Sequence, residues 1–133
     1  MSGFAINVDM KQKTITQLKK KLWELVRERV RETYGNTCYT CGKSNLIGSN
    51  RQVGHFIPKS ICSTELAYDL DNLRIQCFAC NIHKSGNWIE YEAHLMIEKG
   101  RTFPDKLKKR NQKTKGKQYG RWWYEGEIKK YQK

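Results

Sequence analysis

The first third of the chain carries its apolar residues at helical spacing. They recur three or four positions apart: Leu18, Leu22, Leu25, Val26 and Val30. This period places them on one face of a helix, where they can pack on a core. Thr14 and Gln17 precede this stripe in the order of an N-terminal capping box, and Gly35 follows it, where glycine often ends helices. The pattern predicts an amphipathic helix over 14–35.

The middle of the chain carries shorter apolar stretches that are separated by polar turns. Four short elements are predicted there: strands over 52–57 and 73–76, and helices over 78–85 and 88–99. The segment 58–71 between the strands is predicted to be a loop. Asn87 followed by Glu90 indicates a fresh N-cap for the second helix, and Gly100 indicates its end.

In the last third of the chain, a further helix is predicted to begin at Phe103-Pro104, because proline is favoured in the first helical turn. Residues 111–120, rich in Lys, Gln and Gly, are predicted to be a linker, and 121–132 a final helix. Helices flanking a small pair of strands place the chain in the α+β class. The expected organisation has four parts: a loose N-terminus over 1–13, a basic amphipathic helix over 14–35, a central core over 36–100 and a basic helical extension over 101–133.

The chain has 133 residues, enough for one domain, and 38% of them are hydrophobic. That share is below the roughly 45–50% of an average globular domain, so the core should be small and need stabilisation beyond burial. No apolar run approaches the roughly 18 residues of a membrane span, and the start MSGFAINVDMKQK lacks signal-peptide character. We therefore expect a cytoplasmic protein, not a secreted protein, a membrane protein or a metabolic enzyme with a large pocket.

Positive charge is concentrated toward the two ends of the chain. The net charge is +6 over 1–51, −2 over 52–100 and +9 over 101–133, which together make +13. A basic frame of this size, with aromatic residues among the charges, is typical of nucleic-acid-binding proteins. Two other interpretations are a merely solvated surface and a basic membrane-surface helix, although no stretch pairs a clean apolar face with a basic one. The residues expected to contact DNA are Lys19, Lys20, Arg27, Arg31, Lys108, Lys109, Arg110, Lys113, Lys115, Lys117 and Arg121.

Four of the five cysteines form two Cys-x2-Cys pairs: Cys38 with Cys41, and Cys77 with Cys80. Two thiolates three positions apart on a turn can bind one cation, and two such turns complete a tetrahedral zinc site. Four protein ligands indicate a structural zinc. Disulfides are the competing interpretation, but the cysteine count is odd and a secretory signal is lacking. Free structural cysteines are a third, and we expect Cys62, which is left over, to be a free thiol.

Polar residues able to act on a phosphodiester lie between and just after the cysteine pairs. His55, on a predicted short strand, can serve as a general base at neutral pH. Asn81, at a helix start, can offer an amide oxygen to a hard cation such as Mg²⁺, and Lys84 can meet a phosphate one turn later. Each signal is weak alone, since a histidine is more often an ordinary surface residue and an asparagine beside a cysteine is often a cap.

The spacing of these residues resembles that of the HNH endonucleases, which have the ββα-metal fold. The shared string over 38–87 is Cys-x2-Cys, Gly-His, Asp-Asn-Leu and Cys-x2-Cys-Asn-x2-Lys, with 17 residues from His55 to Asn72 and nine from there to Asn81. A narrower likeness is to the phage NinG/Rap recombination endonucleases. It rests on Gln76-Cys77-x2-Cys80-Asn81-x-His83-Lys84-Ser85-Gly86-Asn87, on Tyr91 and Leu95, and on Arg121-Trp122.

The resemblance implies an endonuclease of phage or prophage origin in the bacterial cell. It would act on branched recombination intermediates such as Holliday junctions. By position, His55 resembles the general base that activates water, and Asn72 resembles the asparagine that braces the loop and holds that base. Asn81 occupies the position that ligates the catalytic metal, Mg²⁺ or Mn²⁺, and Lys84 matches a basic residue beside the scissile phosphate. Structural zinc would be the second cofactor.

One position departs from the common HNH pattern. Many members have an aspartate just before the general base, where it binds the metal, but this chain has Gly54. The second metal ligand is therefore unassigned, and four side chains are candidates besides water: Asp69, Asp71, Glu65 and His83. His83 is equally well interpreted as a phosphate or second-sphere contact, and His94 as a structural residue.

Two other functions remain open from the sequence. One is a sequence-specific or nicking HNH nuclease, which usually carries an added recognition domain. The other is a zinc-dependent DNA-binding module whose active site has decayed, which Gly54 favours. Paired cuts across a symmetric junction would suit a homodimer, for which the helix over 14–34 could supply the interface.

Overall fold

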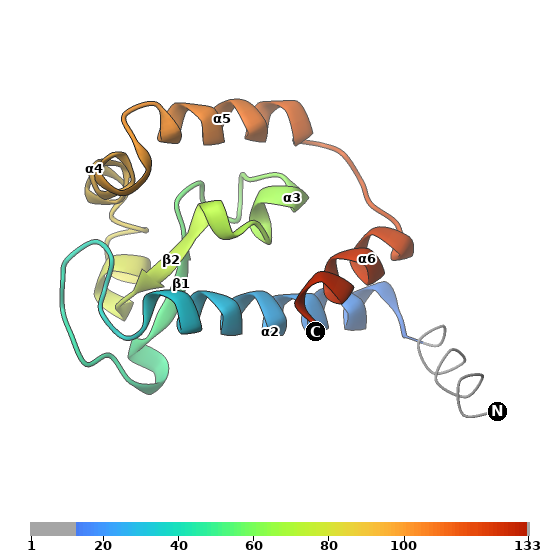
Figure 1. Ribbon diagram of the computed structural model, residues 1–133, viewed down its shortest axis with the longest axis horizontal. Helices are drawn as coiled ribbons and strands as arrows, with labels where there is room; N and C mark the ends of the chain where they lie inside the picture. Colours follow the sequence, from blue (N-terminus) through green and yellow to red (C-terminus); the bar gives the residue numbers. More distant parts are fainter. Residues whose placement is uncertain (1–12, 133) are drawn as a thin grey trace. The chain divides into compact units, whose positions relative to one another are not determined.

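The structure, a computed structural model, describes residues 13–132 as two compact units. The larger unit spans 26–118, and the smaller contains the described residues of 13–25 together with 119–132. Helix α2, Ile15–Tyr34, contributes to both units (Figure 1). The predicted extension over 101–133 is thus divided between the two units. The predicted loose N-terminus over 1–13 lies outside the described residues except for Lys13.

The larger unit contains a two-stranded antiparallel sheet and several short helices, which makes it an α+β fold (Figure 1). In chain order its elements after α2 are η1 (Gly48–Asn50), β1 (Gln52–His55), α3 (Thr64–Ala67), η2 (Leu70–Asn72), β2 (Leu73–Gln76), the π-helical turn η3 (Ala79–His83), α4 (Trp88–Lys99) and α5 (Phe103–Thr114). In the sheet, Gln52 lies opposite Gln76 and His55 lies opposite Leu73.

The hydrophobic core of the larger unit lies where α3, α4 and α5 pack together with the chain that follows β1. Its buried members are Phe56, Ile57, Leu66, Tyr91, Leu95 and Leu107. The Tyr91 hydroxyl also donates a hydrogen bond to the Gly54 carbonyl at 2.7 Å. This bond ties α4 to β1, so the helix that covers the core also fixes the strand that carries His55.

The predicted capping box of α2 is confirmed. The Thr14 backbone N–H donates to Gln17 Oε1 at 2.9 Å, and the Gln17 N–H donates to Thr14 Oγ1 at 3.1 Å. At the other end, Gly35 adopts a left-handed φ of 72°, and its N–H donates to the Arg31 carbonyl at 2.8 Å. Local sequence therefore determines where this helix begins and ends.

Several local predictions are wrong. The strand expected over 52–57 ends at His55, and α5 extends to Thr114, into the linker expected over 111–120. The helix expected over 78–85 is only the π-helical turn η3, and the loop expected over 58–71 contains α3, which Ser63 caps by accepting from the Leu66 N–H at 3.2 Å. Asn87 does not cap α4 with its side chain. Its amide instead donates to Cys80 Sγ at 3.6 Å, so the contact with the cysteine cluster replaces the cap.

The smaller unit contains the first part of α2 and helix α6, Arg121–Tyr131. Its buried apolar side chains come from both segments and are Leu18, Leu22, Tyr124 and Ile128. The Lys19 ammonium lies 5.9 Å from the centre of the Tyr124 ring. No helix within the described part of the chain has an apolar stretch long enough to cross a bilayer.

Candidate functional site

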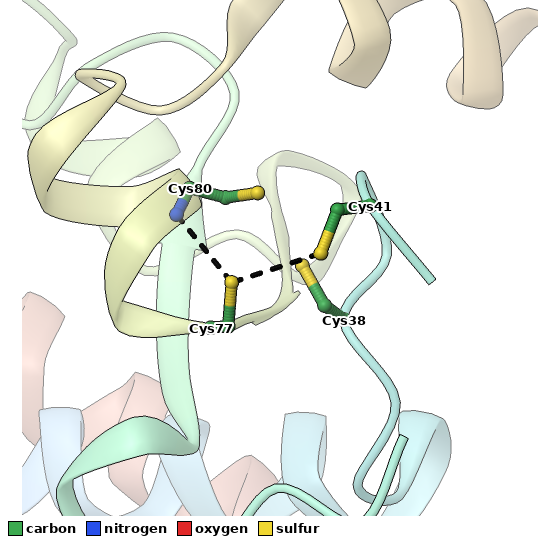
Figure 2. Close-up of side chains that lie close together, drawn as sticks. All are labelled: Cys38, Cys41, Cys77 and Cys80. Carbon is green, nitrogen blue, oxygen red and sulfur yellow. Dashed lines mark hydrogen bonds between the residues drawn. The ribbon is translucent and has the colours of Figure 1, made fainter. Parts of the chain in front are cut away.

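Four cysteine sulfurs lie close together, two from the turn before β1 and two from the turn after β2. The Sγ atoms of Cys38, Cys41, Cys77 and Cys80 all lie within 4.8 Å of one another (Figure 2). The Cys41 and Cys77 sulfurs are 3.8 Å apart, and tetrahedral Zn–S bonds of about 2.3 Å require a separation of about 3.8 Å. Among residues 13–132, no other group of three or more His, Cys, Asp and Glu side chains converges in this way. The cluster could hold a zinc ion with four protein ligands.

Hydrogen bonds connect the cysteine turns to each other and to the sheet. The Cys80 N–H donates to Cys77 Sγ at 3.4 Å, which closes the second turn around its own sulfur. In the first turn, the Tyr39 N–H donates to the Ile75 carbonyl at 2.8 Å. The first turn therefore lies along β2, and the cluster joins that strand at two places.

The thiol pKa values within the cluster diverge. Burial and the neighbouring sulfurs raise the pKa of Cys41 to about 12, and burial also raises that of Cys77. Burial acts in the same direction on Cys38, but hydrogen bonds from the Thr40 hydroxyl and from backbone N–H groups outweigh it and lower the Cys38 pKa to about 6. One thiolate is therefore favoured, and a divalent cation would stabilise the others in the same form.

His55 lies at the end of β1, with its imidazole oriented by a backbone carbonyl. Its Nε2 is 3.0 Å from the Ala67 carbonyl oxygen. A carbonyl oxygen only accepts, so Nε2 carries a hydrogen, and Nδ1 holds the lone pair of the neutral ring. Burial lowers the pKa of His55 below its ordinary value of 6.5, Lys59 lowers it further, and the Ala67 hydrogen bond offsets part of the shift. The ring is thus neutral at pH 7, as a general base requires.

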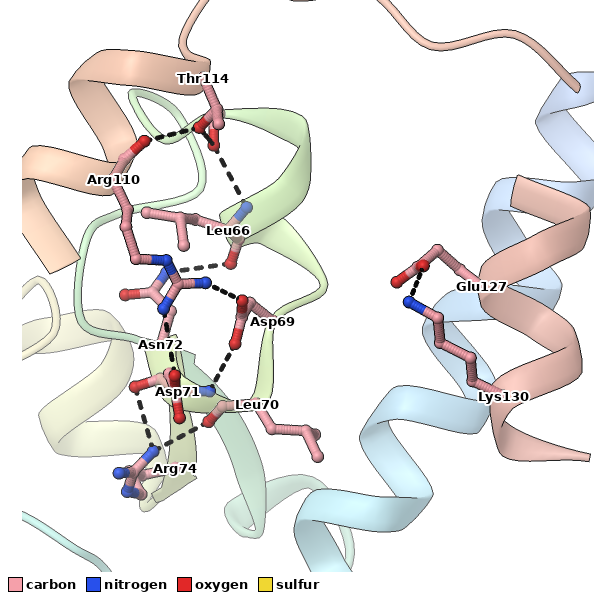
Figure 3. A network of polar contacts seen from close by, with 11 residues as sticks. Leu66, Asp69, Leu70, Asp71, Asn72, Arg74, Arg110, Thr114, Glu127 and Lys130 are labelled. Atoms are coloured by element: carbon pink, nitrogen blue, oxygen red, sulfur yellow. Dashed lines mark hydrogen bonds and ion pairs between the residues drawn. The ribbon is translucent and has the colours of Figure 1, made fainter. Parts of the chain in front are cut away.

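Asn72 is fully buried between the end of β1 and α3 (Figure 3). Its Oδ1 accepts from the Ile57 N–H at 2.8 Å, and its Nδ2 donates to the Ile57 and Leu66 carbonyls at 3.2 Å each. Leu66 directly precedes Ala67, whose carbonyl orients the imidazole. One amide side chain therefore holds both the chain next to His55 and the segment that orients its ring.

Asn81 lies in the π-helical turn η3, and π-helical turns are frequent at functional sites. Its Nδ2 donates to Gln52 Oε1 at 2.8 Å, and its Oδ1 lies 3.1 Å from the point where a Cβ on Gly54 would stand. Lys84, just after the turn, is exposed. His83 is exposed as well, and its ring lies edge-on to that of Phe78 with 5.1 Å between centroids.

Asp69 and Asp71, two candidates for the second metal ligand, face Arg110 of α5 (Figure 3). Arg110 Nη1 donates to Asp71 Oδ2 at 3.1 Å, and Nη2 forms an ion pair with Asp69. These carboxylates and Glu65 belong to no group of three metal-ligating acidic, histidine or cysteine side chains among the described residues. The structure thus places Arg110, expected at DNA, on these two carboxylates, and the assignment of the second metal ligand stays a prediction.

Sequence reasoning did not identify Gln76 as a site residue. This glutamine ends β2 directly before Cys77 and is 0% exposed. Its side chain lies against Gly54, because a Cβ added to that glycine would stand 1.8 Å from Gln76 Oε1. The available signal was a polar residue in a strand whose other positions are mostly apolar, next to a predicted zinc ligand.

Comparison with known proteins identifies the family. A family model described as Bacteriophage Lambda NinG protein matches residues 6–133. The chain belongs to the NinG family. Protein ninG of Escherichia phage 933W is 30% identical over 93 residues, which are 70% of this chain and 43% of that protein. Protein ninG of Escherichia phage lambda is 29% identical and that of Salmonella phage P22 30% identical, with the same shares covered.

The match spans less than half the length of these curated NinG relatives. No solved structure matches the chain. The sequence-based resemblance to the NinG group is thus confirmed at the level of the family. The cysteine cluster and the polar residues around Gly54 all lie within the region that the NinG family model covers.

The basic residues expected at DNA differ from one another in their exposure and in their ion pairs in this member of the NinG family. Arg27, Arg31 and Arg121 are partly buried, and Arg121 pairs with Glu125 at 3.6 Å. Lys108 is exposed but pairs with Glu92 at 3.0 Å. Arg110 pairs with Asp69 and Asp71, as described above. The remaining six residues are exposed: Lys19, Lys20, Lys109, Lys113, Lys115 and Lys117.

Asn72→Ala should destabilise the protein. The substitution leaves the buried Ile57 N–H without an acceptor, and a buried group that loses its hydrogen bond costs about 1–3 kcal/mol. We expect the free energy of unfolding, measured by urea denaturation, to fall by about that amount. Asn36→Ala, at an exposed asparagine, is the matched control and should change stability little. Equal stability of the Asn72 variant and the wild type would contradict the bracing role.

Proposed function

We propose that this chain is a metal-dependent DNA endonuclease of the HNH type that acts on branched recombination intermediates such as Holliday junctions. One observation carries the proposal: His55 ends β1, Asn72 directly precedes the antiparallel strand β2, and Asn81 lies in the turn after β2 that also carries Cys80 of the four-cysteine cluster. The neutral His55 imidazole can act as a general base, the Asn72 amide holds the segment that orients it, and the Asn81 amide oxygen can bind a hard cation.

The proposed reaction is hydrolysis by an activated water. His55 Nδ1 takes a proton from a water molecule, whose oxygen forms a bond to phosphorus while the bond from phosphorus to the 3′ oxygen breaks. The 3′ oxygen then takes up a proton, so the products carry a 5′-phosphate and a 3′-hydroxyl. Asn72 keeps the His55 ring oriented, and Lys84 is available to the phosphate. A Mg²⁺ or Mn²⁺ ion held by Asn81 would supply positive charge where negative charge develops.

The choice of branched DNA rests on the resemblance to the NinG/Rap endonucleases and on the charge distribution. Basic residues occur both before and after the neutral centre of the chain. Contacts of lysines with phosphates are independent of sequence. Junctions present phosphates in relative positions that a linear duplex does not offer, so separate basic segments can select the shape of the DNA.

A comparison of two DNA substrates tests the function. A four-way junction and a linear duplex of the same sequence are incubated with the full chain and Mg²⁺, and the products are resolved on a sequencing gel. We expect cleavage of the junction and little cleavage of the duplex. Equal cleavage of both would favour a sequence-specific or nicking nuclease, and binding without cleavage of either would favour a decayed DNA-binding module.

Neutralising the lysines around the end of α5 should reduce the salt dependence of DNA binding. Lys113, Lys115 and Lys117 are exposed, and each contact with a duplex phosphate contributes about 0.9 to the slope of log K against log salt. The triple glutamine variant should therefore show a slope flatter by up to about 2.7. Lys43→Gln, an exposed lysine not expected at DNA, should leave the slope unchanged. A wild-type slope in the triple variant would show that these lysines do not touch DNA.

A further inference from the structure

The missing aspartate at Gly54 leaves the second oxygen ligand of the catalytic cation to be found. We propose that the Gln76 Oε1 is that ligand, and that it acts with the Asn81 Oδ1 to bind Mg²⁺ or Mn²⁺ beside Gly54. The use of this cation in catalysis rests on the proposed nuclease function. The cation site itself rests on the contacts of the two amide side chains.

The orientation of the Gln76 amide is determined by its hydrogen bonds. Its nitrogen donates to the Gly86 carbonyl at 2.8 Å and meets the Thr40 hydroxyl at 3.1 Å. Because a carbonyl oxygen only accepts, the atom facing Gly86 must be the nitrogen, and the oxygen must point the other way. Both N–H groups are used in these two contacts.

The oxygen of this amide has no donor. Gln76 is 0% exposed, and its Oε1 is a buried acceptor without a hydrogen-bond partner among the described residues. Buried polar atoms in folded proteins are nearly always paired, so an unpaired one calls for an explanation. A cation that accepts oxygen ligands provides one.

The Asn81 amide is oriented by a similar chain of contacts. Gln52 Nε2 donates to the Ser49 carbonyl at 2.8 Å, which leaves Gln52 Oε1 as the acceptor for Asn81 Nδ2, also at 2.8 Å. The Asn81 oxygen is therefore the atom on the side of Gly54. Each of the two amide orientations thus follows from a backbone carbonyl.

The two oxygens meet in the space that a side chain at position 54 would fill. A Cβ there would stand 1.8 Å from Gln76 Oε1 and 3.1 Å from Asn81 Oδ1. No residue larger than glycine fits while Gln76 stays in place. Asn and Gln side-chain oxygens are among the protein ligands of hard cations, and Mg²⁺ usually keeps several waters of its own and also binds substrate phosphates. Gln76 Oε1 therefore occupies the space that a side chain at position 54, such as the aspartate of many HNH nucleases, would begin to fill.

Side-chain amide NMR of the full chain, loaded with zinc, tests the assignment with Mn²⁺ as the probe. Paramagnetic Mn²⁺ broadens the signals of nearby nuclei, even when it binds weakly. In a titration we expect the Gln76 and Asn81 side-chain N–H₂ signals to disappear first, before those of Gln112 and Asn36, which lie on exposed positions. A Gln76 signal that persists while that of Asn81 disappears would overturn the proposal.

Two substitutions of Gln76 separate ligation from a structural role. Gln76→Met removes the oxygen and should weaken Mn²⁺ binding at least tenfold. Gln76→Glu keeps an oxygen in place but loses the nitrogen that donates to Gly86, so it should bind Mn²⁺ at least as tightly as the wild type. A merely structural glutamine predicts the opposite, with the glutamate variant no better than the methionine variant. Asp71→Asn tests a competing candidate for the second ligand and should bind Mn²⁺ as the wild type does if Gln76 is that ligand.

Gly54→Ala tests the same site without altering either ligand. The added methyl group must displace the Gln76 oxygen, so Mn²⁺ affinity should fall at least tenfold while the zinc content stays the same. This variant decides the question if Gln76→Met fails to fold. Unchanged Mn²⁺ affinity in a folded Gly54→Ala protein would overturn the proposal.

The failure of this assignment can be told apart from failure of the proposed nuclease. If Mn²⁺ broadens Gln76 and Asn81 but the wild type cuts no DNA, the cation site stands and the nuclease function fails. If the wild type cuts junctions with Mg²⁺ while Gln76→Met keeps wild-type Mn²⁺ affinity, the function stands and the ligand assignment fails.

Discussion

The His55→Ala protein should cleave junction DNA about 10²–10⁴ times more slowly than the wild type, because that is the usual contribution of a general base. Its affinity for junction DNA and for Mn²⁺ should stay near that of the wild type, since a base acts mainly in the transition state. Single-turnover cleavage under matched conditions measures the effect. His94→Ala is the matched control, because His94 lies half-exposed on α4 with its Nδ1 2.7 Å from the Glu90 carbonyl.

The pH dependence of cleavage gives a second readout of the same residue. A general base must be deprotonated, and burial lowers the pKa of His55 below 6.5. The rate should therefore be at its plateau at pH 7 and fall as the pH drops through this lowered pKa. If the His55→Ala protein, freed of contaminating nucleases, still cuts junction DNA at the wild-type rate, the proposed mechanism is refuted.

Cys77→Ser should unfold the larger unit of the protein. Structural zinc contributes an apparent free energy of about 10–16 kcal/mol in finger peptides, which matches or exceeds the roughly 5–15 kcal/mol stability of a typical domain. Loss of one of four ligands should therefore remove both the metal and the cooperative unfolding transition. Zinc content by elemental analysis and thermal unfolding by circular dichroism measure the two effects.

Cys62→Ser provides the matched control for that substitution. Cys62 packs against the hydrophobic core and lies outside the four-cysteine cluster. The variant should keep its zinc and most of its stability. A folded wild-type protein that contains no zinc would contradict the assignment of the cluster as a zinc site.

Elements specified by neighbouring residues could be predicted from the sequence. The limits of α2 follow from Thr14, Gln17 and Gly35, which act within one turn of the helix ends. The strand over 73–76 was predicted at its observed limits, because alternating apolar and polar residues directly before a cysteine pair leave little freedom. The pairing of the two cysteine turns was also predictable, since the Cys-x2-Cys spacing carries its own geometry.

Features that depend on distant residues could not be predicted in the same way. A π-helical turn replaces the expected regular helix after Phe78, where the second cysteine turn closes. The Asn87 side chain contacts Cys80 and does not cap α4. The ion pairs of Asp69 and Asp71 with Arg110 join residues about forty positions apart. The orientation of the Gln76 amide depends on its contacts with Thr40 and Gly86. The sequence pattern around Gln76 does not identify either residue as its partner.

The hydroxyl of Thr40 touches both proposed metal sites. It lies 3.4 Å from Cys38 Sγ and 3.1 Å from Gln76 Nε2. A Cys38 thiolate bound to zinc would draw the hydroxyl hydrogen toward sulfur and leave an oxygen lone pair for the Gln76 amide. Occupancy of the cysteine cluster then strengthens the hydrogen bond from the Gln76 amide to Thr40, and so holds more firmly the amide orientation that the Gly86 carbonyl sets. Thermodynamic linkage makes such a coupling reciprocal, so the two metals would bind cooperatively, and Thr40→Val would reduce their cooperativity while leaving every ligand in place.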